Sequence, residues 1–133
     1  MSKIKGKETK SEILVRKYIF SKGFRYRKNV GKLPGTPDIV LTKYKTVIFI
    51  HGCFWHYHQE CKEGRLPRSN VEYWKEKLEK NVERDRKTNY MLTLMGWKVI
   101  VIWDCELKKT EIRNYRLEKL ILEILNTNKE LET

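Results

Sequence analysis

The sequence predicts one α/β domain in which helices flank a mixed β-sheet. Segments with apolar residues at helical spacing alternate along it with short runs rich in β-branched residues. The chain has 133 residues, a length that suits a single domain with one core. Hydrophobic residues make up 40% of the chain, so it can fold around such a core. We therefore expect residues 1–133 to form one unit.

The first part of the chain alternates between a helix, a short strand and a loop. Residues 8–22 carry an apolar stripe at helical spacing, and Gly23 is a natural stop for that helix. Residues 24–27 alternate between apolar and basic, which predicts a short strand. Residues 31–37 contain two prolines and two glycines, which predicts a loop.

Two β-branched runs follow, and they predict a pair of strands. They cover residues 38–41 and 46–50, with a turn at residues 42–45. The second run is apolar on both faces, so it should lie in the centre of the sheet. Residues 51–68 have no periodicity, and a loop of this length in a small domain is usually functional or metal-bound.

The remaining elements are two helices and one strand. A long helix is predicted for residues 71–95, with Ser69 and Glu72 at capping-box spacing at its start. A buried strand at residues 98–103 and an amphipathic helix at residues 110–125 follow. We expect a short N-terminal arm and a frayed tail, at residues 1–7 and 126–133.

The long helix has polar residues in the middle of its inward stripe. Either the helix bows there and this face meets solvent, or the polar groups form a hydrogen-bonded network behind a site. The stripe at heptad spacing consists of Trp74, Leu78, Asn81, Asp85, Thr88, Leu92 and Met95.

The charge balance indicates a polyanionic partner. Lysine and arginine total 29 against 17 acidic residues, a formal net charge of +12. Such a field speeds the capture of nucleic acid. A membrane partner is not expected, because there is no long basic amphipathic segment, and no signal peptide opens the chain, which predicts a cytoplasmic protein. Residues 31–37 and 62–68 are the basic segments expected near phosphates.

Three of the four potential zinc ligands lie in one loop. Cys53, His58 and Cys61 have the spacing C-x4-H-x2-C, and Cys105 follows the last predicted strand. Two thiolates and an imidazole suit tetrahedral zinc, and a set of three cysteines and one histidine is closed and therefore structural. The alternative is that Cys53 and Cys105 are buried core thiols and Cys61 has no role.

The same region holds residues suited to hydrolysis. His51 and His56 remain if His58 binds zinc, and histidine is the usual general acid or base near neutral pH. Asp38 follows Pro37 at a strand start, as in nucleases where such a carboxylate binds Mg²⁺. The acidic-x-Lys half of that nuclease motif is missing, so the histidines must replace it.

Large aromatic residues interleave with these polar groups. Phe54 and Trp55 are adjacent on the irregular loop, and Trp74 opens the long helix. Exposed rings on a basic protein are candidates for stacking on bases or wedging between base pairs. For Trp74, packing in the core is an equally good interpretation.

Together these residues resemble the very-short-patch-repair endonucleases. The resemblance covers about residues 6–107 in order, and the string His-Gly-Cys-Phe-Trp-His at residues 51–56 is highly specific. The matching stretches are residues 6–9, 12, 33–40, 47–56, 58, 61, 73–74, 80–86, 96–99 and 101–105.

The resemblance implies a restriction-endonuclease-like fold, a variant of the PD-(D/E)XK superfamily, and a role for each site residue. Asp38 would bind Mg²⁺, and Glu12 would reach two such ions through water. His56 would be the general base, and His51 would assist at the scissile phosphate. Ile50 would offer its backbone carbonyl to Mg²⁺ where the best-known members have threonine.

The resemblance also implies one structural zinc and a mismatched duplex as substrate. Zinc would bind Cys53, His58, Cys61 and Cys105, while Phe54, Trp55 and Trp74 would wedge into DNA. We expect a monomer that nicks one strand beside T·G mispairs arising from deaminated 5-methylcytosine, in the bacterial cytoplasm and with downstream repair proteins as partners. The N-terminal segment that inserts into DNA in this family is short here.

Three other functions compete with this one. A nuclease of the same fold could have a restriction-type or structure-specific target. A zinc-stabilised DNA-binding module would perform no chemistry. A basic structural protein is the least compatible with a loop so dense in histidine and cysteine.

Overall fold

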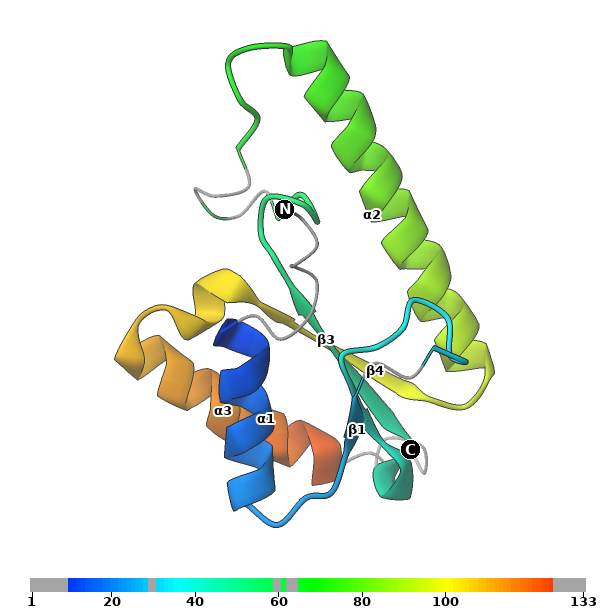
Figure 1. Cartoon of the computed structure of the whole chain (residues 1–133), viewed down its shortest axis with the longest axis vertical. Coiled ribbons are helices and arrows are strands. Elements are labelled where there is room, and N and C mark those ends of the chain that lie inside the picture. Colours follow the sequence, from blue (N-terminus) through cyan, green and yellow to red (C-terminus); the bar gives the residue numbers. More distant parts are fainter. Residues whose placement is uncertain (1–9, 29–30, 59–60, 62–64, 126–133) are drawn as a thin grey trace.

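The computed structural model describes residues 10–28, 31–58, 61 and 65–125. In this part of the chain three helices and a four-stranded sheet form the mixed α/β fold expected from the sequence (Figure 1). The helices are α1 (Lys10–Ser21), α2 (Val71–Leu94) and α3 (Thr110–Leu125). The strands are β1 (Arg27–Lys28), β2 (Ile39–Leu41), β3 (Thr46–His51) and β4 (Lys98–Trp103).

The sheet is mixed, with the order β1-β2-β3-β4. The first three strands are antiparallel neighbours, whereas β4 runs parallel to β3. Parallel neighbours need a crossover, and α2 lies within it. The carboxyl ends of β3 and β4 therefore meet at one edge, where His51 pairs with Trp103. The prediction that residues 46–50 form a central strand is confirmed.

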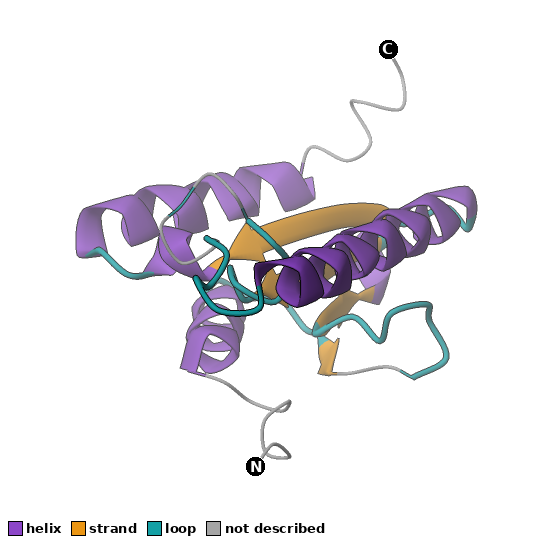
Figure 2. Ribbon diagram, turned by 90° about the horizontal axis from the view of Figure 1, so that it is seen from above, coloured by secondary structure: helices purple, strands orange, loops and turns teal. Residues whose placement is uncertain are grey.

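Alternation along the strands builds a core on each face of the sheet. On one face Ile48 and Ile102 pack with residues of α1 and α3, such as Ile19 and Leu120. On the other face Val40, Val47 and Phe49 pack against Leu92 of α2. Figure 2 shows the strands lying between these helices. The prediction of a sheet flanked by helices is confirmed, and helices on both faces keep its apolar side chains from water.

The predicted strand at residues 24–27 is largely wrong. Phe24 is buried in the core and Tyr26 packs against it, so the alternation is present. Strand pairing is restricted to Arg27 and Lys28, because β2 gives way to a short 3₁₀ helix, Thr42–Tyr44, just where the earlier residues would need partners. The alternation of apolar and basic residues therefore reflects which side chains are buried, although these residues do not pair with a neighbouring strand.

The ends of α2 also differ from the prediction. The N-cap residue is Asn70, which has a left-handed backbone with a φ of 53° and makes no side-chain capping bond, so the capping box at Ser69 and Glu72 is wrong. The helix ends at Leu94, and Met95 is 48% exposed and not inward-facing as predicted. The positive φ at Gly96 lets the chain turn toward β4.

Strand β4 was predicted to be buried, and it is so only at alternate positions. Ile100 and Ile102 are buried, whereas the residues between them are partly exposed, because β4 is an edge strand. Among the described residues, no helix is both long and apolar enough to cross a membrane. The predicted arm at residues 1–7 and tail at residues 126–133 lie outside the described residues, as do residues 62–64 of the predicted basic segment.

Candidate active site and metal centre

The predicted catalytic residues line one cavity. Glu12 of α1, Asp38 before β2, His51 at the end of β3 and His56 from the following loop surround a volume of about 310 Å³. The residues come from four separate segments, and the sheet and the loop after β3 bring them together. The structure thus places Asp38 and His56 on a common cavity, which hydrolysis of one phosphate would require.

The carboxylate of Asp38 is fixed by the backbone of the central strand. Its Oδ2 accepts a hydrogen bond of 2.7 Å from the backbone N–H of Ile50. Burial raises the pKa of Asp38 above its usual value. The hydrogen bond from the Ile50 N–H, a hydrogen bond that shares a proton with the Glu12 carboxyl, and the charge of Arg16 partly offset this effect. A buried carboxylate of this kind is stabilised by a cation.

Glu12 is buried beside Asp38 and is held by an arginine one turn along α1. Arg16 Nη2 lies 3.3 Å from Glu12 Oε1, and both side chains are nearly inaccessible to solvent. The same nitrogen donates a hydrogen bond of 3.4 Å to the backbone carbonyl of Asp38. Arg16 thus links the first helix to the start of β2 and offsets negative charge in the site.

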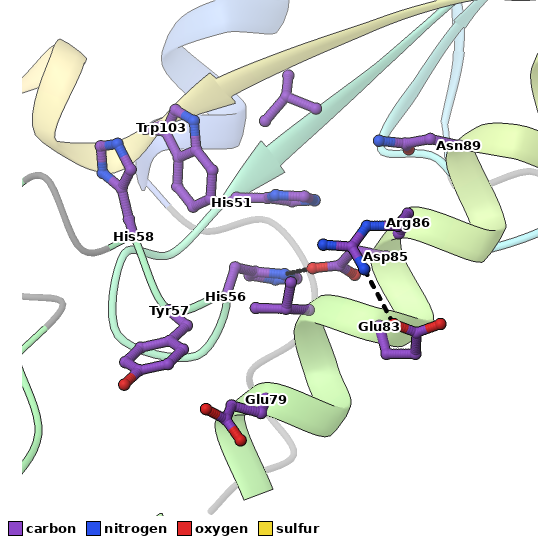
Figure 3. A pocket seen from close by; sticks show the side chains of 12 residues that line it. His51, His56, Tyr57, His58, Glu79, Glu83, Asp85, Arg86, Asn89 and Trp103 are labelled. Carbon is purple, nitrogen blue, oxygen red and sulfur yellow. Dashed lines mark hydrogen bonds and ion pairs between the residues drawn. The ribbon is translucent and has the colours of Figure 1, made fainter. Parts of the chain in front are cut away.

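His56 is oriented by Asp85 of the long helix. His56 Nδ1 lies 2.6 Å from Asp85 Oδ2, as drawn in Figure 3. Burial raises the pKa of Asp85, but the hydrogen bond and charge of His56 outweigh that effect, so the pKa lies below its usual value. An ionised Asp85 can accept a hydrogen bond from the Nδ1–H of His56. The proton then stays on Nδ1, and the lone pair of Nε2 is available as a base.

His51 lies flat on His56. The two rings are parallel within 2°, with centroids 3.7 Å apart, and Figure 3 shows them one over the other. Burial and the charge of His56 lower the pKa of His51 to about 4, although Asp85 acts in the opposite direction. His51 is therefore neutral near pH 7. Its Nδ1 is buried and makes no hydrogen bond to the described residues.

The predicted zinc ligands converge at the carboxyl ends of the two parallel strands. Because His51 pairs with Trp103, Cys53 and Cys105 each follow the paired position by two residues. One ligand atom from each of Cys53, His58, Cys61 and Cys105 lies within 4.8 Å of the others. Cys105 Sγ is 3.5 Å from His58 Nδ1. The four side chains thus form one cluster, which supports the predicted metal site over the alternative of unrelated thiols.

The chemistry of this cluster fits a soft divalent cation. Burial raises the pKa of Cys53, and burial together with the other two thiols raises the pKa of Cys105 to about 12. Three neighbouring thiolates repel one another and need a cation between them. Three sulfur donors and one imidazole match the tetrahedral preference of zinc.

The three predicted wedge residues form one aromatic cluster. The ring of Phe54 lies 5.0 Å from that of Trp55 and 5.4 Å from that of Trp74, both in edge-to-face geometry. Trp55 is 52% exposed, and Trp74 is partly buried. The cluster is thus anchored on α2 and presents an exposed ring to solvent, which an aromatic wedge requires.

Comparison with known proteins decides the family. Residues 1–63 match the model of the family described as DNA mismatch endonuclease Vsr. The chain is 56% identical to a type II nicking enzyme of Neisseria meningitidis over 124 residues, which cover 93% of this chain and 88% of that protein. It is 40% identical to the DNA mismatch endonuclease Vsr of Escherichia coli over 111 residues, which cover 84% of this chain and 70% of the other. The chain belongs to the Vsr family. The resemblance found in the sequence is confirmed.

Asp85 and Arg16 are the site residues of this Vsr-family chain that sequence analysis did not assign. Asp85 gave a signal, because it is one of the polar residues in the inward stripe of the long helix. Two of those residues form hydrogen bonds with the histidine loop: Asp85 accepts from the ring of His56, and Asn81 donates to the backbone carbonyl of Trp55. This supports the predicted network behind a site. The sequence did not single out Arg16, because it is one of 29 lysine and arginine residues in the chain.

Proposed function

We propose that this protein nicks one strand of duplex DNA beside T·G mispairs that arise from deamination of 5-methylcytosine, by Mg²⁺-dependent hydrolysis of a phosphodiester. Membership of a family of DNA mismatch endonucleases gives the substrate class. The observation that carries the chemistry is the common cavity of Asp38, Glu12 and the hydrogen-bonded His56–Asp85 pair. A fixed carboxylate and an oriented imidazole are what hydrolysis of a phosphodiester requires.

Asp38 and Glu12 provide hard oxygen donors of the kind that Mg²⁺ prefers. Asp38 and the backbone carbonyl of Ile50 would hold the ion directly, and Glu12 would act through water on a pair of ions. Bound there, Mg²⁺ would neutralise the charge that develops on the scissile phosphate. A cation at this position would also stabilise the ionised form of Asp38, whose pKa is raised by burial.

The histidines supply the proton transfer. His56, with its Nδ1 proton held by Asp85, accepts a proton from the attacking water at Nε2. His51 is neutral and packs flat against His56, so it fixes the plane of that ring and lies at the edge of the cavity, beside the expected position of the phosphate. Neither step needs a side chain outside the described cavity.

The aromatic cluster is proposed to contact the mispair. Phe54, Trp55 and Trp74 would insert beside the mispaired bases and unstack them, a deformation that costs less at a mismatch than at a paired step. The net charge of +12 would draw the protein to DNA before this step.

The cluster of three cysteines and His58 is proposed to hold one structural zinc ion. All four positions of a tetrahedral ion would be taken by protein, so no position would remain for water or substrate. The ion would tie the loop that carries His56 and the aromatic residues to the end of β4. The proposed fold is the restriction-endonuclease-like PD-(D/E)XK variant, in a single domain that acts as a monomer in the bacterial cytoplasm and passes its product to downstream repair proteins.

A nicking assay on labelled duplexes tests this function. Zinc-loaded protein with Mg²⁺ is expected to nick the T·G duplex and to leave a matched duplex and a branched duplex intact. Equal cutting of all three would reject mismatch specificity in favour of another nuclease target. Binding without cutting in either Mg²⁺ or Mn²⁺ would favour a DNA-binding module.

A further inference from the structure

A hydrogen bond joins the first turn of α1 to the end of β4. Ser11 Oγ donates to Asp104 Oδ1 at 2.6 Å, across 93 residues of sequence. A hydroxyl that donates to a carboxylate at this distance makes one of the stronger hydrogen bonds found in proteins. Asp104 also lies near the N-terminus of the helix, where a negative charge is favourable.

Ser11 and Asp104 are each adjacent in sequence to a residue of the cavity or of the cysteine cluster. Ser11 directly precedes Glu12, whose carboxylate lines the cavity with Asp38. Asp104 stands between Trp103, which pairs with His51, and Cys105 of the cysteine cluster. The bond therefore connects the part of α1 that carries the catalytic carboxylate to the strand end that carries the proposed zinc ligand.

Glu12 is thus held from both sides. Arg16, one turn later on α1, makes an ion pair with Glu12 and a hydrogen bond to the backbone of Asp38. The Arg16 contacts set how Glu12 faces β2. Neither Arg16 contact reaches the carboxyl ends of β3 and β4, where the histidine loop begins. The Ser11–Asp104 bond restrains the first turn of α1 relative to those ends.

We propose that Ser11 and Asp104 are positioning residues that hold Glu12 in register with Asp38 in the cavity, and that they thereby connect the cysteine cluster to the metal-binding carboxylates. This inference rests on the proposed role of Glu12 near Mg²⁺. A carboxylate that acts through water depends on its distance from the ion, so a small displacement of α1 weakens metal binding more than it slows the chemical step.

The test compares Ser11→Ala with Ser21→Ala in the zinc-loaded protein. Ser21 lies at the other end of the same helix and also makes a hydrogen bond of 2.6 Å, to the backbone carbonyl of Tyr18. Binding of Mn²⁺ in the absence of DNA is measured from the electron paramagnetic resonance signal of the free ion. The Mg²⁺ concentration for half-maximal nicking and the saturated rate are measured in parallel.

Ser11→Ala is expected to weaken Mn²⁺ binding and to raise the half-saturating Mg²⁺ concentration by roughly threefold to tenfold, the range that matches the net contribution of one typical hydrogen bond. The saturated rate should change less than about twofold. Ser11→Thr keeps the hydroxyl and should behave as the unmodified protein. Ser21→Ala removes an exposed local hydrogen bond and should leave both metal measurements unchanged. The nearly unchanged saturated rate of Ser11→Ala would remove general destabilisation as an explanation of its weaker metal binding.

A double variant separates positioning from additive damage. If Ser11 acts through Glu12, Ser11→Ala combined with Glu12→Gln should bind Mn²⁺ no more weakly than Glu12→Gln alone. Equal behaviour of Ser11→Ala and Ser21→Ala, with Glu12→Gln still weakening Mn²⁺ binding, would overturn this inference and leave the proposed function standing. If Glu12→Gln itself left Mn²⁺ binding unchanged, the proposed role of Glu12 would fail and this inference with it.

Discussion

A histidine acts as a base near neutral pH only when one ring nitrogen carries the proton and the other keeps its lone pair. For the base proposed here, His56, that choice would be made by Asp85, whose carboxylate lies 2.6 Å from His56 Nδ1. His51 packs against one face of the same ring. The ring of His56 is thus held at its edge by a carboxylate and on its face by a neutral ring.

Replacement of Asp85 by asparagine is expected to slow nicking by about 10²- to 10⁴-fold, the usual contribution of a general base. The amide can donate to Nδ1 and so favours the tautomer whose proton is on Nε2, which cannot accept another. Single-turnover rates at saturating Mg²⁺ measure this loss. Glu83→Gln is the matched control, because Glu83 is an exposed acid on the same helix and pairs with Arg86. A loss below about threefold for Asp85→Asn would contradict the role given to this pair.

Replacement of Asp38 by asparagine is expected to abolish nicking, with a loss of at least about 10³-fold, because the carboxylate that would hold Mg²⁺ is removed. Binding to T·G duplex should persist. Because burial raises the pKa of Asp38, its ionised form costs folding free energy at neutral pH, and the neutral amide should raise Tm by a few degrees in the absence of Mg²⁺. Nicking, duplex binding and thermal melting together check this prediction. A protein that still nicks, or one that melts far earlier, would contradict it.

A site residue could be predicted from the sequence when it lies close along the chain to other residues suited to catalysis or metal binding. His51 and His56 lie in one loop with the cysteines, so each supports the assignment of the others. Asp85 lies 29 residues from His56, and the sequence does not state which side chains α2 presents to the loop. Its position in a polar break of the inward stripe was the available clue.

At the scale of elements, strands that carry β-branched runs were predicted well, and short or irregular ones were not. The run that became β3 is apolar on both faces, which only a central strand allows. The first strand has two residues, and its extent is decided by where β2 ends and a 3₁₀ helix begins. Such an end is set by tertiary pairing and not by local propensity. The predicted capping box at Ser69 and Glu72 is wrong for a similar reason, because Asn70, with a left-handed backbone, is the N-cap residue.

The loop before Asp38 depends on a glycine pressed against α2. Gly35 has a φ of 75°, and a Cβ there would lie 2.5 Å from Thr88 Cγ2 and 3.3 Å from the ring of Phe49. Gly35→Ala is therefore expected to lower Tm by roughly 5–10 °C, from both backbone strain and crowding. Nicking should also fall, since the same loop carries Asp38.

Alanine variants of two other glycines distinguish backbone strain from crowding. Gly23 has a φ of 94° with nothing within 4 Å of a built Cβ, so Gly23→Ala adds strain without crowding and should cost about half as much in Tm. A Cβ on Gly31 also meets nothing within 4 Å, and no positive φ opposes it, so Gly31→Ala should leave Tm nearly unchanged. Equal melting of the Gly35 and Gly31 variants would show that the loop does not pack as described.

At the scale of the whole molecule, one topological fact builds both centres. Because β3 and β4 are parallel and in register, the residues that follow each strand emerge side by side. This brings Cys53 near Cys105, and it places the histidine loop above the cavity. The spacing of the proposed ligands could be predicted from the sequence, but the strand register that brings them together could not. That register determines that a cysteine at position 105 meets a loop that begins after position 51.

Removal of zinc tests how far the molecule depends on this arrangement. The purified protein is expected to contain one zinc ion per chain, and a strong chelator should lower Tm by about 10 °C or more, because binding of a structural zinc ion contributes directly to folding. Cys105→Ala should lose most of the bound metal and show the same early melting. Removal of Mg²⁺ alone is the control, and it should not destabilise the fold, since two carboxylates without the phosphate of the substrate would hold that ion only weakly. Because the loop carries His56 as well as three of the four proposed ligands, the chelated protein should also lose nicking even when Mg²⁺ is saturating. A protein that keeps its Tm and its nicking after complete loss of zinc would show that hydrogen bonds and packing alone hold the loop.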